Sequence, residues 1–335
     1  RMSRRKVIAR RLSAVEALGS CTFIASDKTG TLTMNELTTR RVLLPGEPAW
    51  EVTGGGVTPD GTVVVTAGRE GESARRRITR LCEAVALCND GTLARRDGQW
   101  TSHGDAVDVA LLVLAKKIGI DRAVLETEHP RLAQIPFEAE RQYAASLNRG
   151  AQGERVTVKG AGERVLAMCD RMAGPDGDVP IDLGALEREA HALAAAGYRM
   201  LAIADGAPAQ HGVLEPGDLR GLVFLGFVGM IDPLRAEAKR AVEACRGAGI
   251  EVAMVTGDHP VTAFAIASEL GMVARPEQVV TGGALKEAAA GGLQSYDRLV
   301  GQGRVFARVE PQQKLEIVQA LIRLGLVKAR NFRDN

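Results

Sequence analysis

Residues 21–33 read CTFIASDKTGTLT, and this stretch decides the fold that we expect for the chain. Residues 21–26 are a short apolar run of the kind that forms a buried strand of a parallel sheet. Asp27 follows that run directly and precedes the polar turn 28–31. Backbone amides and hydroxyls at such a strand end can meet a phosphate, so Asp27 is a candidate to attack a phosphoryl group.

A second strand end of this kind lies in the last third of the chain. The apolar run EVAMV at 251–255 leads into Thr256, Gly257 and Asp258. Strands that alternate with helices indicate βαβ units and a parallel sheet, whose ligands lie beyond the carboxyl ends of its strands. Thr256 and Gly257 would therefore bring a hydroxyl and a backbone N–H to the same phosphate as Asp27.

Phosphoryl transfer also needs positive charge near the equatorial oxygens, usually from Mg²⁺ and a lysine. Lys314, at the start of a helix expected over 311–324, is a candidate for that lysine. Asp27 and the carbonyl of Thr29 are candidate oxygen ligands for the ion. Taken singly these residues have plainer alternatives, because Thr-Gly-Asp turns are common and a lone helix lysine is usually solvated.

Residues 36–215 differ in pattern from the segments on either side. Gly-rich turns, such as 53–60 and 176–180, separate short alternating stretches and scattered helices. We expect an antiparallel α+β domain here, inserted into a parallel α/β domain. The regular pattern resumes with the apolar run 222–229, which we assign to the parallel sheet, so that MIDPLR at 230–235 follows a third strand end.

Composition limits the partners of the chain. Its 335 residues suffice for two domains with separate cores, and 43 basic against 41 acidic residues argue against a nucleic-acid partner. The five cysteines lack the spacing of zinc sites or of a disulfide framework and fit a reducing cytosol.

The apolar runs are too short for a membrane-spanning helix, so we expect a soluble chain. We also expect a basic amphipathic helix over 1–18 and solvated arginines at 75–77.

The heptapeptide DKTGTLT at 27–33 is the phosphorylation signature of the P-type ATPases, and the chain resembles that family along nearly its whole length. Further segments match in the family's order: KGAGE at 159–163, MIDPLR at 230–235, MVTGDHPVTAFAIASELGM at 254–272 and FARVEPQQKLEIVQAL at 306–321. The resemblance implies an α/β fold with a haloacid-dehalogenase-like, Rossmann-like parallel sheet, split by an inserted α+β antiparallel nucleotide-binding domain.

The domain boundaries follow from that resemblance. Residues 1–35 would form the first part of the phosphorylation domain, with a stalk helix. Residues 36–215 would form the nucleotide-binding domain, and residues 216–335 the second part of the phosphorylation domain.

The same resemblance implies roles for individual residues. Asp27 would form an aspartyl phosphate with the γ-phosphoryl group of ATP, which Thr256 and Lys314 would hold. Residues that would shape the contacts to nucleotide and phosphate are Asp232, Arg235 and Asp258. The predicted catalytic set is Asp27, Lys28, Thr29, Thr256, Gly257, Asp258 and Lys314, with Asp27 and Thr29 as ligands of Mg²⁺.

In the insert, two segments resemble the adenine site of the family. GDAVDVALL at 104–112 indicates Asp108 as the acidic residue that reaches adenine, and IPFEAER at 135–141 indicates Phe137 as the stacking ring. Alone, Asp108 would be interpreted as a surface residue and Phe137 as a core residue. The family often has Glu in place of Asp108 and a basic residue and methionine within 142–144, so the affinity for adenine would be altered.

Three more residues of the insert are expected at the nucleotide. Lys159 and Gly160 belong to the motif KGA and would line the pocket. Arg199, in the segment GYRMLAIA, matches an arginine that reaches the phosphates.

Family members continue past 306–321 into a GDGxNDxP loop whose aspartate completes the Mg²⁺ site, whereas this sequence ends IRLGLVKARNFRDN. We therefore expect weak or absent phosphorylation of this polypeptide alone. One alternative function is a nucleotide-binding module without turnover. Another is a soluble haloacid-dehalogenase phosphatase, although Thr29 stands where such an enzyme has its second, proton-transferring aspartate.

The resemblance as a whole implies the catalytic fragment of an ATP-driven cation pump at the cytoplasmic face of a membrane. The stretches RRLSAVEALGS at 10–20 and TGDHPVTA at 256–263 are most similar to the type II, calcium-pump-like branch. The implied partners are ATP with Mg²⁺, the transported cation, and the transmembrane and actuator domains of the full-length protein. No nucleic acid is expected, and these residues do not identify the ion.

Overall fold

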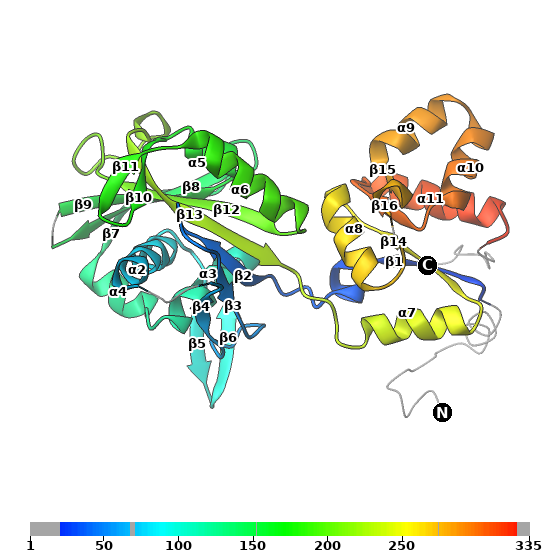
Figure 1. Ribbon diagram of the computed structural model, residues 1–335, viewed down its shortest axis with the longest axis horizontal. Coiled ribbons are helices and arrows are strands. Elements are labelled where there is room, and N and C mark those ends of the chain that lie inside the picture. Colours follow the sequence, from blue (N-terminus) through cyan, green and yellow to red (C-terminus); the bar gives the residue numbers. More distant parts are fainter. Residues whose placement is uncertain (1–20, 68–70, 152, 274, 327–335) are drawn as a thin grey trace. The chain divides into compact units, whose positions relative to one another are not determined.

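The computed structural model describes residues 21–67, 71–151, 153–273 and 275–326 (Figure 1). The amphipathic helix expected over 1–18 lies outside them. The chain divides into two compact units, one of residues 36–233 and the other of residues 1–35 with 234–335. Both combine helices with strands, so the fold is mixed α/β, with one parallel and one largely antiparallel sheet. No helix among the described residues is long and apolar enough to cross a membrane.

A ten-stranded sheet forms the centre of the 36–233 unit. Its main path runs β4-β3-β2-β13-β12-β9-β8-β7, and β10 and β11 join it at β13. The strands are β2 (Thr38–Leu43), β3 (Trp50–Val52), β4 (Val63–Val65), β7 (Arg131–Ile135), β8 (Tyr143–Gly150), β9 (Gly153–Gly160), β10 (Cys169–Gly174), β11 (Gly177–Pro180), β12 (Arg199–Gly206) and β13 (Leu222–Ile231). All neighbours pair antiparallel except β10 and β13.

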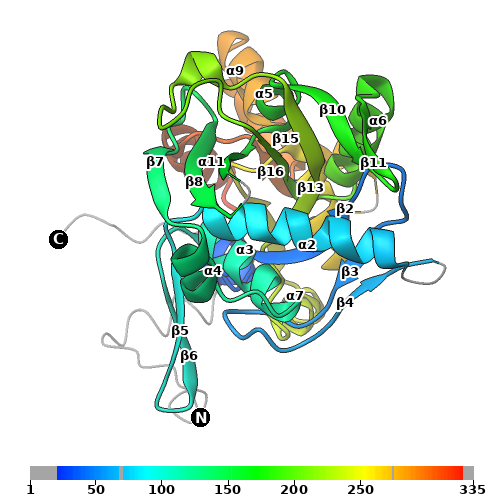
Figure 2. The ribbon, with the colours of Figure 1, turned by 90° about the vertical axis from the view of Figure 1, so that its left-hand side faces the viewer.

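Helices cover both faces of this sheet. One face packs against α2 (Glu72–Leu87), α3 (Ala106–Lys117) and α4 (Arg122–Glu128), with α2 and α3 in front in Figure 2. The other packs against α5 (Gly162–Leu166) and α6 (Leu183–Ala195). Each face has its own hydrophobic core, and successive side chains of β12 point to opposite faces. Ile203 belongs to the core under α2, α3 and α4, whereas Ala202 and Ala204 belong to the core under α5 and α6. A separate hairpin joins β5 (Thr92–Arg96) to β6 (Gln99–His103), and a 3₁₀ turn spans Pro216–Asp218.

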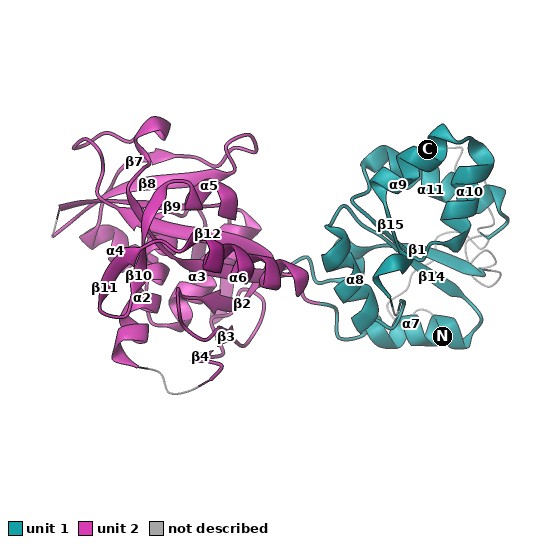
Figure 3. Cartoon of the chain, turned by 45° about the horizontal axis from the view of Figure 1, so that its top comes forward, with its two compact units in different colours: residues 1–35, 234–335 teal, residues 36–233 magenta. Residues whose placement is uncertain are grey.

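The other unit, drawn in teal in Figure 3, contains a parallel sheet in the order β1-β14-β16-β15. Its strands are β1 (Phe23–Asp27), β14 (Glu251–Val255), β15 (Val279–Thr281) and β16 (Val305–Ala307). Its helices are α7 (Ala238–Gly247), α8 (Pro260–Glu269), α9 (Gly282–Ala290), α10 (Leu293–Gln302) and α11 (Pro311–Arg323), with a 3₁₀ turn at Pro276–Gln278.

The faces of the parallel sheet again separate by alternation. Val255 and Phe306 pack with α9, α10 and α11, whereas Met254 and Val305 pack with α7 and α8. A parallel sheet is expected to be covered on both faces, because its crossover helices must lie on them. The parallel pairing predicted for the strands at 21–26 and 251–255 is confirmed.

The assignment of the apolar run 222–229 to the parallel sheet is wrong. It forms β13, which pairs with β2 and β12 in the 36–233 unit, and the chain returns to the parallel unit at Leu234 instead of residue 216. A continuous apolar run indicates a strand buried on both faces, and β13 is such a strand. Because both sheets have covered faces, the run does not reveal which sheet it joins.

The prediction of solvated arginines at 75–77 is wrong for Arg77, which is 6% exposed. Its guanidinium forms an ion pair with Glu47 and donates to the carbonyls of Pro45, at 3.0 Å, and Ala173, at 3.3 Å. Arg77 precedes Ile78 on the buried side of α2, so the fold supplies acceptors that a charge run does not reveal.

Asp205, on β12, is 2% exposed. It is the most buried acidic residue among the described residues of the 36–233 unit, which is the larger of the two units. Two guanidiniums satisfy it: Arg80 of α2 donates to both of its carboxylate oxygens, at 2.7 and 2.9 Å, and Arg155 of β9 donates to Oδ2 at 2.6 and 3.0 Å. The carboxylate thus ties α2 to two neighbouring strands.

Replacing Asp205 with alanine should lower the free energy of unfolding by about 3 kcal/mol or more, because two arginines would lose their buried acceptor. Urea titration followed by circular dichroism measures this change. The exposed Asp176→Ala is the control and should change stability little. Equal stability of the two variants would show that the Asp205 cluster is not stabilising.

Candidate functional site

In the parallel unit, the register of β1 and β14 brings the predicted catalytic residues together. Asp27 lies opposite Val255, so Asp27 and Thr256 leave neighbouring strands at the same edge of the sheet. The N–H of Thr256 donates to the carbonyl of Phe306 at 2.8 Å, and its hydroxyl accepts the N–H of Asp258 at 3.1 Å. Thr256 is 1% exposed, and these two hydrogen bonds fix its backbone and hydroxyl next to the end of β1.

Two lysines compensate the two carboxylates at this edge. The Nζ of Lys314, on the first turns of α11, lies 2.6 Å from Oδ2 of Asp27. The Nζ of Lys28 lies 2.7 Å from Oδ2 of Asp258. Lys28 is almost fully buried, whereas Asp27 and Lys314 are 47% and 36% exposed. A ligand can therefore reach the Asp27–Lys314 pair, while the Lys28–Asp258 pair is more enclosed.

The turn after Asp27 depends on Gly30, whose φ of 74° lies in the region that favours glycine. The N–H and the hydroxyl of Thr33 both donate to the carbonyl of Lys28 at 3.1 Å. Nη2 of Arg235 donates to the carbonyl of Gly30 at 3.1 Å. Arg235, expected at nucleotide and phosphate, thus contacts the turn that carries Asp27.

The oxygen donors at this edge fit an ion that is shared with phosphate. Mg²⁺ is usually bound through one or two carboxylates, water and substrate phosphates. Asp27 supplies a carboxylate, and Thr29 follows it with an extended backbone and an exposed side chain. The described residues contain no group of three or more His, Cys, Asp or Glu that would hold a metal by itself.

In the 36–233 unit, a cavity of about 440 Å³ brings together four of the residues predicted at the nucleotide. They come from α3, from the segment after β7, from β9 and from β12, and they are Asp108, Phe137, Lys159 and Arg199. A cavity of this size with apolar walls and a few polar groups is typical of a small-molecule site.

The polar end of this cavity is built on Asp108, in the first turn of α3. Lys159 of β9 forms an ion pair with Oδ1 of Asp108, and the N–H of Asp90 donates to Oδ2 at 2.9 Å. The side chains of Lys159 and Asp108 are 8% and 14% exposed. Their charges compensate each other in a poorly hydrated place, where an unpaired charge would be costly.

The apolar part of the cavity contains an unusually exposed ring. Phe137 follows β7 and is 60% exposed, although large apolar side chains are most often buried. Small or aliphatic residues, Ala144, Ala145 and Leu201, line the cavity as well. A ring beside such walls suits a planar ligand.

Three residues predicted at the nucleotide, Gly160, Asp232 and Arg235, do not line this cavity. A Cβ on Gly160 would lie 2.5 Å from Cβ of Tyr143 and 2.6 Å from the carbonyl oxygen of Gln142, so close strand packing requires glycine there. Asp232 follows β13, and its Oδ1 accepts the N–H of Glu36 at 3.2 Å. Asp232 therefore joins the first and last segments of its unit.

Sequence reasoning missed several polar residues that line the cavity: Cys88, Asn89, Asp90, Arg131, Gln134 and Ser146. Single polar residues at strand and helix ends carry no motif. Only the meeting of α2, α3, β7 and β8 brings them to one place.

Comparison with known proteins identifies the family. Residues 77–237 match the family model described as P-type ATPase, cytoplasmic domain N. The chain is 42% identical, over 98% of its length, to the cation-transporting ATPase pma1 of Synechocystis sp.. The chain belongs to the P-type ATPase family.

Calcium-transporting proteins are among the relatives. The calcium-transporting ATPase type 2C member 1 of Bos taurus is 34% identical and a calcium-transporting ATPase of Bacillus subtilis is 32% identical, each over 98% of this chain. The chain spans 33% of the Bos taurus protein and 37% of the Synechocystis and Bacillus proteins. It is thus about a third of the length of these relatives.

Burial raises the pKa of the Cys88 thiol, at the cavity wall, to about 11. The thiol should stay protonated at pH 8, because a raised pKa disfavours the thiolate. Iodoacetamide at pH 8 should leave Cys88 unmodified in the native protein and label it in urea, as measured by peptide mass spectrometry. The less buried Cys245 is the control, and equal labelling of both in the native protein would contradict the prediction.

Proposed function

We propose that this chain binds ATP in the cavity of its 36–233 unit and that, in the intact protein, the γ-phosphoryl group passes to Asp27. The parallel unit would then be a haloacid-dehalogenase-like phosphorylation domain, split by the nucleotide-binding domain. The observation that carries the proposal is the exposed Asp27 carboxylate beside Thr256 with Lys314 at 2.6 Å. The family supports the same reaction.

In the proposed step, Oδ1 of Asp27 attacks the γ-phosphorus. The bond to the bridging oxygen breaks, and ADP leaves with its electron pair. Lys314 and the backbone amides near Thr256 stabilise charge on the transferred group. Mg²⁺ held by Asp27 and the Thr29 carbonyl would neutralise phosphate charge. Thr29 cannot act as the general acid and base of a soluble phosphatase, which favours a lasting aspartyl phosphate.

In the cavity of the other unit, Phe137 would stack on adenine and Asp108 would accept a hydrogen bond from its amino group. Lys159, already paired with Asp108, would remain as the compensating cation. Arg199, at the start of β12, would reach the phosphates.

The intact protein would couple this chemistry to cation movement at the cytoplasmic face of a membrane, with its transmembrane and actuator domains as partners. The names of the Bos taurus and Bacillus subtilis relatives include calcium transport, which supports Ca²⁺ as the cation. Calcium-dependent phosphorylation of the intact protein in membrane vesicles would support Ca²⁺ as the transported ion, and phosphorylation that does not depend on Ca²⁺ would contradict it.

Asp27→Asn in the intact protein should abolish labelling by γ-labelled ATP, because the amide lacks the nucleophilic carboxylate. The label in the parent should be acid-stable and released by hydroxylamine, and ATP binding should persist in the variant. Asp176→Asn, a change at an exposed residue, should label like the parent. Undiminished labelling of Asp27→Asn would exclude Asp27 as the acceptor.

Phe137→Ala should weaken ATP binding about tenfold, because the stacking surface for the base is lost. The fold should be unaffected, since the ring is 60% exposed. Isothermal titration calorimetry on this chain measures the affinity. Val124→Ala removes another apolar side chain of similar exposure, 58%, outside the cavity and is the matched control. If both variants bind like the parent, the base does not lie on Phe137.

A further inference from the structure

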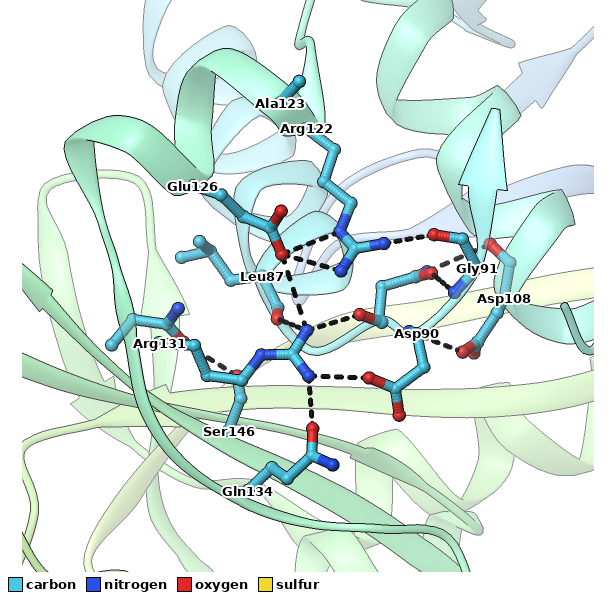
Figure 4. Close-up of polar contacts among 12 residues, drawn as sticks. Leu87, Asp90, Gly91, Asp108, Arg122, Ala123, Glu126, Arg131, Gln134 and Ser146 are labelled. Carbon is cyan, nitrogen blue, oxygen red and sulfur yellow. Dashed lines mark hydrogen bonds and ion pairs between the residues drawn. The ribbon is translucent and has the colours of Figure 1, made fainter. Parts of the chain in front are cut away.

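Arg131 lies in the wall of the nucleotide cavity and has no role in the proposed reaction. It is the first residue of β7, and its side chain is 21% exposed. Its Nη1 donates to Oδ1 of Asp90 at 2.6 Å, and its Nη2 donates to the carbonyl oxygens of Asn89, at 2.5 Å, and Leu87, at 3.4 Å (Figure 4). Several of its donors are therefore directed at one short segment.

That segment, residues 87–91, joins the end of α2 to β5 and is held from several sides. Asn89 is 3% exposed, and its side-chain amide donates to the carbonyls of Val85, at 3.2 Å, and Asp108, at 3.0 Å. Arg122 of α4 donates to the carbonyl of Gly91. The segment is thus fixed to α3 and α4 as well as to Arg131.

The segment in turn orients Asp108. The N–H of Asp90 donates to Oδ2 of Asp108, while Oδ1 pairs with Lys159, as Figure 4 shows for the first of these contacts. A chain of polar contacts therefore runs from Arg131 through Asp90 to Asp108. Without Arg131, the amide that fixes one carboxylate oxygen would lose its own support.

An oriented carboxylate distinguishes purines by their hydrogen-bonding groups. A carboxylate held opposite position 6 of the base accepts a hydrogen bond from the 6-amino group of adenine, whereas the 6-oxo group of guanine would present another acceptor there and be repelled. We propose that Arg131 is a positioning residue that sets the preference of this cavity for adenine over guanine nucleotides. The inference rests on the proposed nucleotide binding.

These contacts depend on the guanidinium group of arginine, and positive charge alone would not form them. A guanidinium is a planar fork that can reach the Asn89 carbonyl and the Asp90 carboxylate at once. A lysine at this position would keep the charge but present one compact ammonium. Arg131→Lys therefore separates the geometry of the contacts from the effect of positive charge on the phosphates.

The test compares ATP and GTP binding by this chain with calorimetry, together with the melting temperature. Arg131→Lys should weaken ATP binding about tenfold and GTP binding less than about twofold, so the ratio of affinities falls. Asp90→Ala, which removes one acceptor at a 61% exposed side chain, should lower the ratio in the same direction and remains available if Arg131→Lys does not fold.

Arg155→Lys is the matched control. Arg155 is 23% exposed, donates to carboxylates and to the Arg80 carbonyl, and lies outside this cavity, so its variant should lose stability with an unchanged ATP to GTP ratio. If Arg131→Lys lost affinity for ATP and GTP equally, or if the parent did not prefer ATP, the proposed role of Arg131 would be overturned. The proposed nucleotide binding would still stand. A parent that binds no ATP would overturn the proposed function as well.

Discussion

The parallel pairing of β1 with β14 is the constraint on which the rest of the chain depends. It joins residues 23–27 to residues 251–255, so everything between them must leave the sheet and return to it. The bridge between Thr33 and Leu234, with the N–H of Arg235 donating to the carbonyl of Leu32 at 2.9 Å, ties the departing and returning segments together. An insert of nearly 200 residues can then fold separately, because its ends are already held close.

The same pairing creates the chemistry at the strand ends. Parallel strands bring their carboxyl ends to one edge, and there Asp27 and Thr256 become neighbours although they are far apart in sequence. The carboxylates of this edge each have a lysine partner, and the more exposed pair includes Asp27.

In the 36–233 unit, charged groups lie in a poorly hydrated part of the cavity wall. Lys159 and Asp108 compensate each other, and a backbone amide satisfies the second carboxylate oxygen. Arg131 and Arg122 hold the segment that supplies this amide. The polar end of the cavity is therefore held by contacts from several elements, while the ring of Phe137 is exposed.

The sequence by itself determined the family, the parallel pairing around Asp27, the residues that meet at that strand end and four of the residues that line the cavity, because motifs follow strand ends and local chemistry. Only the tertiary structure decided to which sheet residues 222–231 belong, because an apolar run does not indicate the strands with which it pairs. It also decided the burial of Arg77 and the contacts of Arg131, because their acceptors are carbonyls and carboxylates from distant segments. Such partners become neighbours only when the helices and strands pack.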